Sequence, residues 1–227
     1  KPAGMLSQKA KDSDESLVEY LIDYLLGSGQ LSREELKSFR PSVCNRLDRN
    51  TSGLVAAGKS LLGLQVLSKA IKERTIGKYY LCIVKGVIDS PRRIQGWLLK
   101  NEKTNQVTVT KQRREGSLPI ETEYVPMASD GHYTLLKVKL ITGRSHQIRA
   151  HLASIGHPII GDTKYGDPRE NLAAKKKYGI SCQLLHAALL VLPEELPEEL
   201  SRLRGMEVSA PLPDVFAAFA GQLQGGR

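Results

Sequence analysis

The stretch NRLDRNTSGL, residues 45–54, carries more information than any other part of this 227-residue chain. It places one carboxylate, Asp48, between two guanidinium groups, Arg46 and Arg49, and it ends in Thr-Ser-Gly-Leu. Because Asn, Asp, Ser and Gly favour turns, the stretch is predicted to be a loop, where functional groups concentrate. Flanking positive charge keeps an aspartate ionised at neutral pH, which suits a nucleophile. On these ten residues alone, a surface loop with local ion pairs is the alternative.

Three further stretches carry recognisable motifs: KYYLCIVKG at 78–86, TGRSHQIRAH at 142–151 and IIGDTKYG at 159–166. NRLDRNTSGL resembles the catalytic loop of the RluA-type pseudouridine synthases. The three further stretches resemble, in the same order as in that family, its Lys-x-Tyr strand, its Arg-containing motif and its Gly-Asp-x-x-Tyr-Gly turn. LLHAALL and KPAG also fit the family, so the resemblance covers nearly the whole chain. Asn45 stands where the family usually has His, and we assign it no chemical role because Asn cannot carry charge.

The resemblance implies an enzyme that isomerises uridine in RNA to pseudouridine. Such an enzyme breaks the bond between uracil N1 and ribose, turns the base and rejoins it through carbon 5. No cofactor is implied, because the uracil supplies both the leaving and the attacking atom. The expected substrate is large-subunit ribosomal RNA, with transfer RNA as the second choice.

Two further function classes are alternatives. One is a non-catalytic RNA-binding factor in ribosome assembly, which the intact Asp48, Tyr80 and Arg144 argue against. The other is a metal-dependent nuclease, which needs several carboxylates around Mg²⁺. The sequence around Asp48 and Asp162 has no carboxylate cluster of that kind, so we expect no metal site.

The resemblance assigns catalytic roles to Asp48, Tyr80 and Arg144. Asp48 is the carboxylate that attacks or stabilises the reacting nucleotide, and a sugar adduct, a glycal and a base adduct all remain open as routes. Arg144 is its ion-pair partner, with a phosphate contact as the alternative. Tyr80 lies against the target base, with a core position as the alternative, whereas Tyr79 points to the opposite sheet face.

RNA contacts are expected from a second set of side chains. They grip phosphates or fill the stack that a flipped nucleotide leaves, and they are Arg46, Arg49, Lys78, His146, Gln147 and Arg149. The net charge of +9 points the same way. All of it arises between residues 69 and 114, where twelve Lys and Arg face three acidic residues. Such a segment suits a polyanion, although a solvated basic face is the alternative.

The composition constrains location and partners. No apolar run approaches the roughly 20 residues that span a bilayer, and no signal peptide is visible. Cys44, Cys82 and Cys182 lie far apart, which argues against disulfides or a zinc knuckle and favours the cytoplasm. The sequence therefore predicts a cytoplasmic monomer whose partner is RNA and not a membrane. The resemblance also implies that residues 1–227 are one catalytic domain without its natural N-terminal strand or an N-terminal RNA-binding domain.

Hydrophobic periodicity and turn residues predict an α+β fold. Helices are expected at 16–26, with Leu17, Leu21, Tyr24 and Leu25 inward, at a capping box opened by Ser32, and at 60–73, 145–155 and 214–223. Strands are expected at 78–86, 93–99, 106–110, 120–127, 133–141 and 180–192. Short turns between the strands favour antiparallel pairing. The expected architecture is the pseudouridine synthase fold: a mixed, mostly antiparallel sheet with flanking helices and a central active-site cleft, with Asp48 on its floor.

Overall fold

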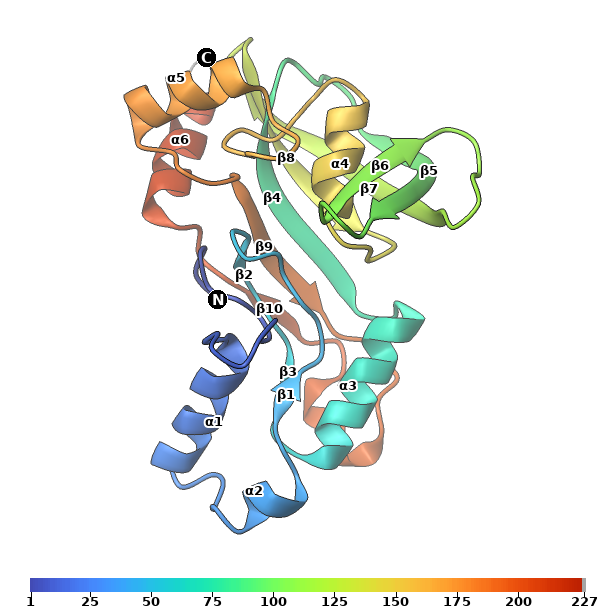
Figure 1. Cartoon of the computed structure of the whole chain (residues 1–227), viewed down its shortest axis with the longest axis vertical. Coiled ribbons are helices and arrows are strands. Elements are labelled where there is room, and N and C mark those ends of the chain that lie inside the picture. The colour runs from blue at the N-terminus through green and yellow to red at the C-terminus, as the bar shows by residue number, and fades with distance from the viewer. Residues whose placement is uncertain (226–227) are drawn as a thin grey trace. The chain divides into compact units, whose positions relative to one another are not determined.

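The computed structural model describes residues 1–225, which divide into two compact units (Figure 1). One unit comprises Lys1–Gly77 and Leu190–Ser209, and the other comprises Lys78–Leu189 with the segment that follows Ser209. The described residues form an α+β fold with a mixed, mostly antiparallel eight-stranded sheet and flanking helices. The predicted fold class is thus confirmed.

The first unit is mainly helical. Its elements are α1 (Leu17–Gly27), α2 (Glu35–Ser38), β1 (Ser42–Val43), β2 (Ser52–Gly53), β3 (Ala57–Gly58), α3 (Leu61–Glu73), the 3-10 helix η1 (Glu198–Leu203) and β10 (Glu207–Ser209). Ser60 caps α3 by accepting a hydrogen bond from the Gly63 amide, so the predicted helix is confirmed. The predicted capping box is present too, because Ser32 and Glu35 exchange side-chain and backbone hydrogen bonds.

The inward face of α1 differs from the predicted one. Val18, Ile22 and Leu25 are buried and two of them pack against β1, whereas Tyr24 is 63% exposed. The prediction that Tyr24 faces inward was wrong. The sequence SLVEYLIDYLL is apolar around much of the helix, so periodicity alone left the face ambiguous, and the position of β1 decides it.

The second unit contains most of the sheet. Its strands lie in the order β9 (Leu185–Val191), β4 (Gly77–Lys85), β8 (Tyr133–Leu140), β7 (Leu118–Ser129), β5 (Arg92–Asn101) and β6 (Gln106–Thr110). The four-strand run from β8 to β6 pairs antiparallel throughout, as does β4 with β8, where Tyr80 lies opposite Val138. The strand predicted at 180–192 begins later, at Leu185, because residues 180–184 form a loop.

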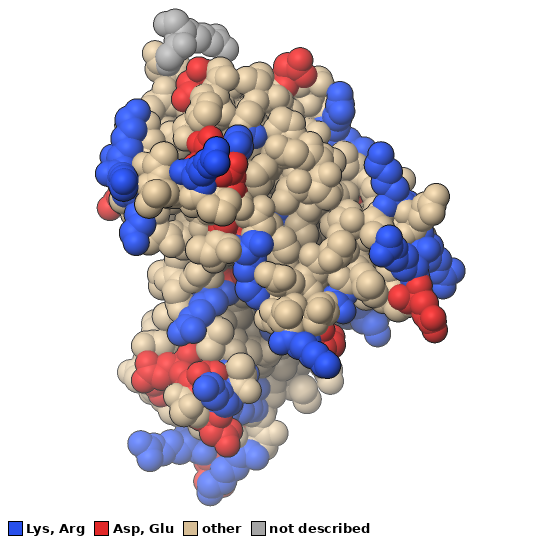
Figure 2. Space-filling model, turned by 45° about the horizontal axis from the view of Figure 1, so that its top comes forward, with Lys and Arg blue, Asp and Glu red and all other residues tan. Residues whose placement is uncertain are grey.

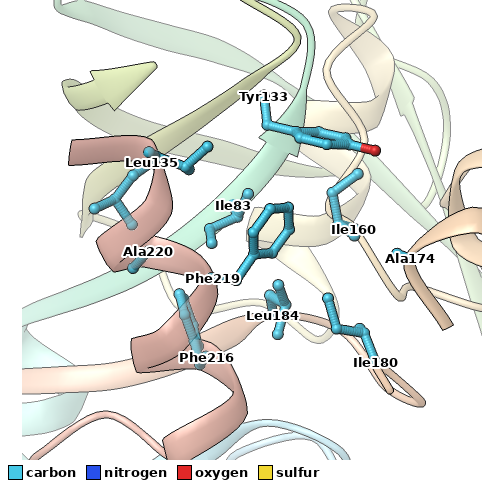
Figure 3. Close-up of a cluster of buried hydrophobic side chains, with 11 residues drawn as sticks. Ile83, Tyr133, Leu135, Ile160, Ala174, Ile180, Leu184, Phe216, Phe219 and Ala220 are labelled. Carbon is cyan, nitrogen blue, oxygen red and sulfur yellow. The ribbon is translucent and has the colours of Figure 1, made fainter. Parts of the chain in front are cut away.

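Three helices belong to this unit: α4 (Gln147–Ser154), α5 (Pro168–Tyr178) and α6 (Asp214–Gly225). The predictions at 145–155 and 214–223 are confirmed, but α5 was missed. Phe216, Phe219 and Leu223 of α6 pack with Ile83 and Leu135 of the sheet in an apolar cluster (Figure 3). The longest described helix, α3, has 13 residues, and no helix in residues 1–225 has the length and apolar character for crossing a membrane.

The second unit also buries a titratable histidine. His151 of α4 is 2% exposed, and its Nδ1 lies 3.0 Å from the Thr122 hydroxyl oxygen on β7. Burial lowers the pKa of His151 from 6.5 to about 4, so the folded protein keeps the imidazole neutral. The unfolded chain takes up this proton at higher pH, and folding stability is therefore lost as pH falls from about 6.5 towards 4.

We predict that His151→Gln reduces the acid sensitivity of the fold. Between pH 7 and pH 5 the parent should lose on the order of 1–2 kcal/mol more unfolding free energy than the variant, because glutamine has no proton to gain. Urea unfolding of both proteins at the two pH values measures the difference. Equal losses in parent and variant would show that His151 does not carry this pH dependence.

Candidate active site

The Asp48 loop is fixed by backbone and side-chain bonds to the first residues of the chain. The Ser7 hydroxyl accepts a hydrogen bond from the Leu47 amide at 3.0 Å and donates one to the Leu47 carbonyl at 3.1 Å. Arg49 donates from Nε to the Gly4 carbonyl, and the Gly4 amide donates to the Arg49 carbonyl. The residues on both sides of Asp48 are thus held by the N-terminal segment, while Asp48 itself is half-buried.

Asn45, which replaces the family's usual His, has a structural contact. Its side-chain oxygen accepts a hydrogen bond from the Ala56 amide at 2.8 Å, and the adjacent Cys44 amide donates to the Ala56 carbonyl at 2.7 Å. Asn45 therefore holds together the two ends of the stretch that contains Asp48. Among the two predicted RNA contacts in this loop, Arg46 is exposed, and Arg49 is exposed apart from its bond to Gly4.

The cysteines carry free thiols. Cys44 packs at the edge of an apolar cluster with Leu67 and Ala70, and burial raises the pKa of its thiol, as expected for a small apolar filler. Cys82 on β4 is fully buried, and burial raises its pKa strongly. In residues 1–225, no three His, Cys, Asp or Glu side chains are placed to hold a metal ion.

Strand β4 separates the two tyrosines as predicted. Lys78, Tyr80 and Cys82 are buried on one face of the strand, with Lys78 and Tyr80 each 6% exposed. On the other face, the Tyr79 ring lies 5.1 Å from the Lys137 ammonium. The period of two therefore places the lysine and the tyrosine of Lys-x-Tyr side by side on the buried face.

The turn that carries Arg144 is held by a buried glutamine. The Gln147 side-chain oxygen accepts hydrogen bonds from the Thr142 hydroxyl at 2.8 Å and the Arg144 amide at 3.1 Å. Its amide nitrogen donates to the Glu121 carbonyl and to the Thr122 hydroxyl on β7. All hydrogen-bonding groups of the Gln147 side-chain amide are thus engaged within the fold, and its predicted RNA contact stays a prediction.

Arg144 itself has an unsatisfied group. Its Nε atom is buried and has no hydrogen-bond partner among the described residues. A buried donor without an acceptor costs free energy, of order 1–3 kcal/mol and more for a charged group. An acceptor on a bound substrate would satisfy it.

Arg149 forms a buried ion pair with Asp162. Its Nε and Nη2 atoms donate to the two carboxylate oxygens at 2.6 and 2.9 Å, a two-point contact. Burial alone would raise the pKa of Asp162, but the bonds and charge of Arg149 hold that pKa below its ordinary value. Asp162 also accepts hydrogen bonds from the amides of Lys164 and Tyr165. Arg149 thus has a structural contact in the fold, and its predicted RNA contact stays a prediction.

The Gly-Asp-x-x-Tyr-Gly turn needs both of its glycines. Gly161 has a φ of +81° and lies against the Cys182 carbonyl, and Gly166 lies against the Asp162 carbonyl, with no room for a side chain at either position. Tyr165 extends from the turn, and its hydroxyl is 2.8 Å from Nδ1 of His146. The turn thus also positions His146, the remaining predicted RNA contact on α4.

Two residues that hold this turn have no structural role predicted from the sequence. They are Asp162, which the sequence offers only as a metal ligand, and Asn171. Asn171 donates to the Asp162 carbonyl at 2.8 Å and accepts from the Gly161 amide at 2.7 Å. The motif itself contained a signal for Asp162, since a lone carboxylate between Gly and a turn requires a partner, but nothing in the sequence identified Asn171.

Comparison with known proteins places this geometry in a family. A family model described as RNA pseudouridylate synthase matches residues 1–154 of the 227. The chain belongs to this family. The matched range includes the Asp48 loop, strand β4 and the turn that carries Arg144.

Curated relatives are similar over most of the chain. The chain is 34% identical over 185 residues to ribosomal large subunit pseudouridine synthase C of Vibrio cholerae, which covers 79% of this chain and 56% of that protein. It is 34% identical over 169 residues to ribosomal large subunit pseudouridine synthase D of Borreliella burgdorferi, covering 73% of this chain and 50% of that protein. The chain therefore spans about half the length of these curated relatives.

Solved structures share the fold. Human RNA pseudouridylate synthase domain containing 4 superposes with a TM-score of 0.76 at 20% identity, covering 99% of this chain and 88% of that chain. Human RNA pseudouridylate synthase domain containing 1 superposes with a TM-score of 0.60 at 22% identity, covering 90% and 85%. At these identities the similarity concerns the fold alone.

We predict that Arg149→Met destabilises the protein without a specific loss of RNA affinity. The substitution leaves Asp162 buried without its counter-charge, which costs about 3–5 kcal/mol of unfolding free energy. Asp162→Asn in the same chain should recover part of the loss, because it removes the unpaired charge and keeps an oxygen for the backbone amides. Urea unfolding of parent, single and double variants measures this. A stable Arg149→Met protein that binds RNA poorly would return Arg149 to the RNA contacts.

Proposed function

We propose that this chain catalyses the isomerisation of uridine to pseudouridine in RNA. The proposal rests on one observation above all: the family match spans, in order, the loop of Asp48, the strand of Lys78 and Tyr80, and the turn of Arg144. The reaction needs a carboxylate, a residue against the base and a cation, and these residues have the chemistry to provide them. We further propose that the whole chain, including both compact units, acts as the catalytic domain.

Asp48 is the proposed catalytic carboxylate. When the bond between uracil and ribose weakens, positive charge develops on the sugar, as in glycoside hydrolysis, and a nearby carboxylate stabilises it or bonds to it. The anchoring of Leu47 and Arg49 to Ser7 and Gly4 supports this role, because a nucleophile must be held in position. The exposed Arg46 and Arg49 beside it are proposed to contact phosphates of the flipped-out nucleotide.

Tyr80 and Arg144 are proposed to act on the same nucleotide. Tyr80 offers an aromatic face for the target base, with Lys78 on the same strand face. Arg144 is proposed to pair with the Asp48 carboxylate and to orient it. Its buried Nε without a partner among the described residues supports a role in which an anionic group completes the site.

Large-subunit ribosomal RNA is the proposed substrate. The relatives named above are ribosomal large subunit pseudouridine synthases, and the net charge of +9 suits a phosphate-rich partner. Ribosomal and transfer RNA from cells lacking the protein, incubated with it and mapped for pseudouridine, would identify the target. Modification of transfer RNA alone would replace the ribosomal assignment, and no modification of either would contradict the proposed activity.

We predict that Asp48→Asn abolishes turnover while fold and RNA affinity remain. Asparagine preserves the shape of the side chain but lacks the negative charge that the reaction needs. Pseudouridine formation should fall by more than about a hundredfold, with the melting temperature and the Kd for RNA nearly unchanged. Asp12→Asn, at an exposed position of the same unit, is the matched control and should behave as the parent. Residual activity above about a hundredth of the parent rate would contradict the nucleophile assignment.

Arg144 substitutions distinguish support of the carboxylate from phosphate binding. In the first role, Arg144→Ala should lower kcat by orders of magnitude with little change in affinity for long RNA, since many phosphate contacts remain. Arg144→Lys should be intermediate, because lysine restores charge but not the planar two-point contact. Single-turnover rates and binding isotherms measure both quantities. Weaker binding with a salt slope reduced by about one, and normal turnover at saturation, would instead make Arg144 a phosphate contact.

A further inference from the structure

Helix α5 (Pro168–Tyr178) presents a basic surface outside the segment that the family model matches, which ends at residue 154. The side chains that face outward from it are exposed; they are Arg169, Leu172, Ala173, Lys175, Lys176 and Lys177. Figure 2 shows Lys and Arg side chains gathered at the upper left of the molecule, where Figure 1 places α5. We call Arg169 and the three lysines the α5 basic face.

The acidic residues of α5 and of its cap are engaged by neighbouring groups of the fold. Asp167 caps α5 by accepting hydrogen bonds from the amides of Arg169 and Glu170, and it binds the Lys85 ammonium at 2.7 Å. Glu170 accepts a hydrogen bond from the Tyr133 hydroxyl at 2.9 Å and lies 3.7 Å from Lys85. The outward surface of the helix therefore carries four cations and no carboxylate of its own.

Helix α5 is packed firmly against other elements of the second unit. Ala174 is buried in the apolar cluster of α6, and Tyr178 stacks on Phe219 with 4.5 Å between the ring centres. Asn171 bonds to the turn of Asp162. Cations displayed on such an element have fixed backbone positions, and Arg169 and Lys176 are seven residues, or about 10 Å, apart along the same stripe.

Helix stability does not explain the whole basic face. The lysines lie in the last turn, where the helix dipole favours positive charge. Arg169 lies in the first turn, where the same dipole disfavours it. Arg169, Lys175 and Lys176 also form no ion pair with any residue in the described range 1–225. The position of Arg169 is thus unfavourable for the isolated helix and needs another reason.

We propose that the α5 basic face binds backbone phosphates of the RNA substrate away from the reacting uridine. The inference rests on the proposed function, since it names a further part of the surface that the same substrate contacts. Phosphates match the face because they supply negative charge, while the carboxylates of α5 and its cap are bound to Lys85 and Tyr133. The contacts are with the backbone, so they add affinity and orientation and leave base selection to other residues.

The test is the double variant Arg169→Ala/Lys176→Ala, with Lys11→Ala/Arg33→Ala as control. Both pairs are exposed and remove two positive charges. Binding of large-subunit ribosomal RNA is measured from low to physiological salt. Each lost phosphate contact makes the slope of log K against log salt shallower by about 0.7 to 0.9. If the face binds phosphates, removing two contacts therefore reduces the slope by about 1.5. In the control variant, both the salt slope and kcat at saturating RNA remain those of the parent.

Thermal unfolding separates lost binding from lost structure. Arg169→Ala alone should keep or raise the melting temperature, because it removes a cation from the helix N-terminus and introduces the best helix former, yet it should weaken RNA binding. An unchanged salt slope in the double variant, or an equal change in the control, would overturn the proposal. Parent protein that binds RNA through α5 but forms no pseudouridine would contradict the proposed function and leave the α5 basic face standing.

Discussion

The buried ion pair between Arg149 and Asp162 is the interaction on which the second unit depends. Removing two charges from water is expensive, and the cost is offset only when geometry and further hydrogen bonds satisfy both groups. Asp162 meets this condition with two contacts from Arg149 and two backbone amides. The pair joins α4 to the turn at 159–166, and Asn171 extends the connection to α5. Arg144 precedes α4, so the positions of this arginine, of His146 and of the α5 basic face all follow from one buried carboxylate.

The same principle divides the motif residues into two groups. Gln147, Arg149, Asp162 and Ser7 use their polar atoms on the backbone or on other buried side chains, and burial keeps those atoms away from a substrate. Arg46 remains exposed, and Arg144 keeps a buried donor without a partner in the described residues. A sequence motif therefore contains both the groups that react and the groups that hold them. Hydrogen-bond satisfaction distinguishes the two, because a fully bonded buried side chain has nothing left to offer a ligand.

Local signals in the sequence predicted much of the fold. Helix α3, strand β4 and the capping box at Ser32 depend on residues within a few positions, and all three are confirmed. Helix α5 was missed because PRENLAAKKKY has almost no apolar face, and tertiary bonds from Asp167, Glu170 and Asn171 hold it instead. Its termini did carry signals, with Pro168 after a capping Asp and Gly179 in the left-handed conformation. Likewise, only the distant Asp162 reveals that Arg149 is structural, and spacing along the chain contains no sign of it.

Charge counted along the sequence is a poor guide to charge on the surface. The segment 69–114 contains the whole net excess, yet several of its cations are neutralised in space. Lys85 pairs with Asp167 and Glu170, Arg93 with Glu121, Lys100 with Glu102 and Lys69 with Glu73, while Lys78 is buried. Two of those carboxylates come from α5 and its cap, so Lys85 pairs with the only two acidic residues of the stretch 167–178, which also contains four Lys and Arg. The exposed side of α5 is left cationic as a result. A phosphate backbone responds to the charges that remain unpaired at the surface, and the pairing of Lys85 with Asp167 and Glu170 leaves the cations of α5 among them.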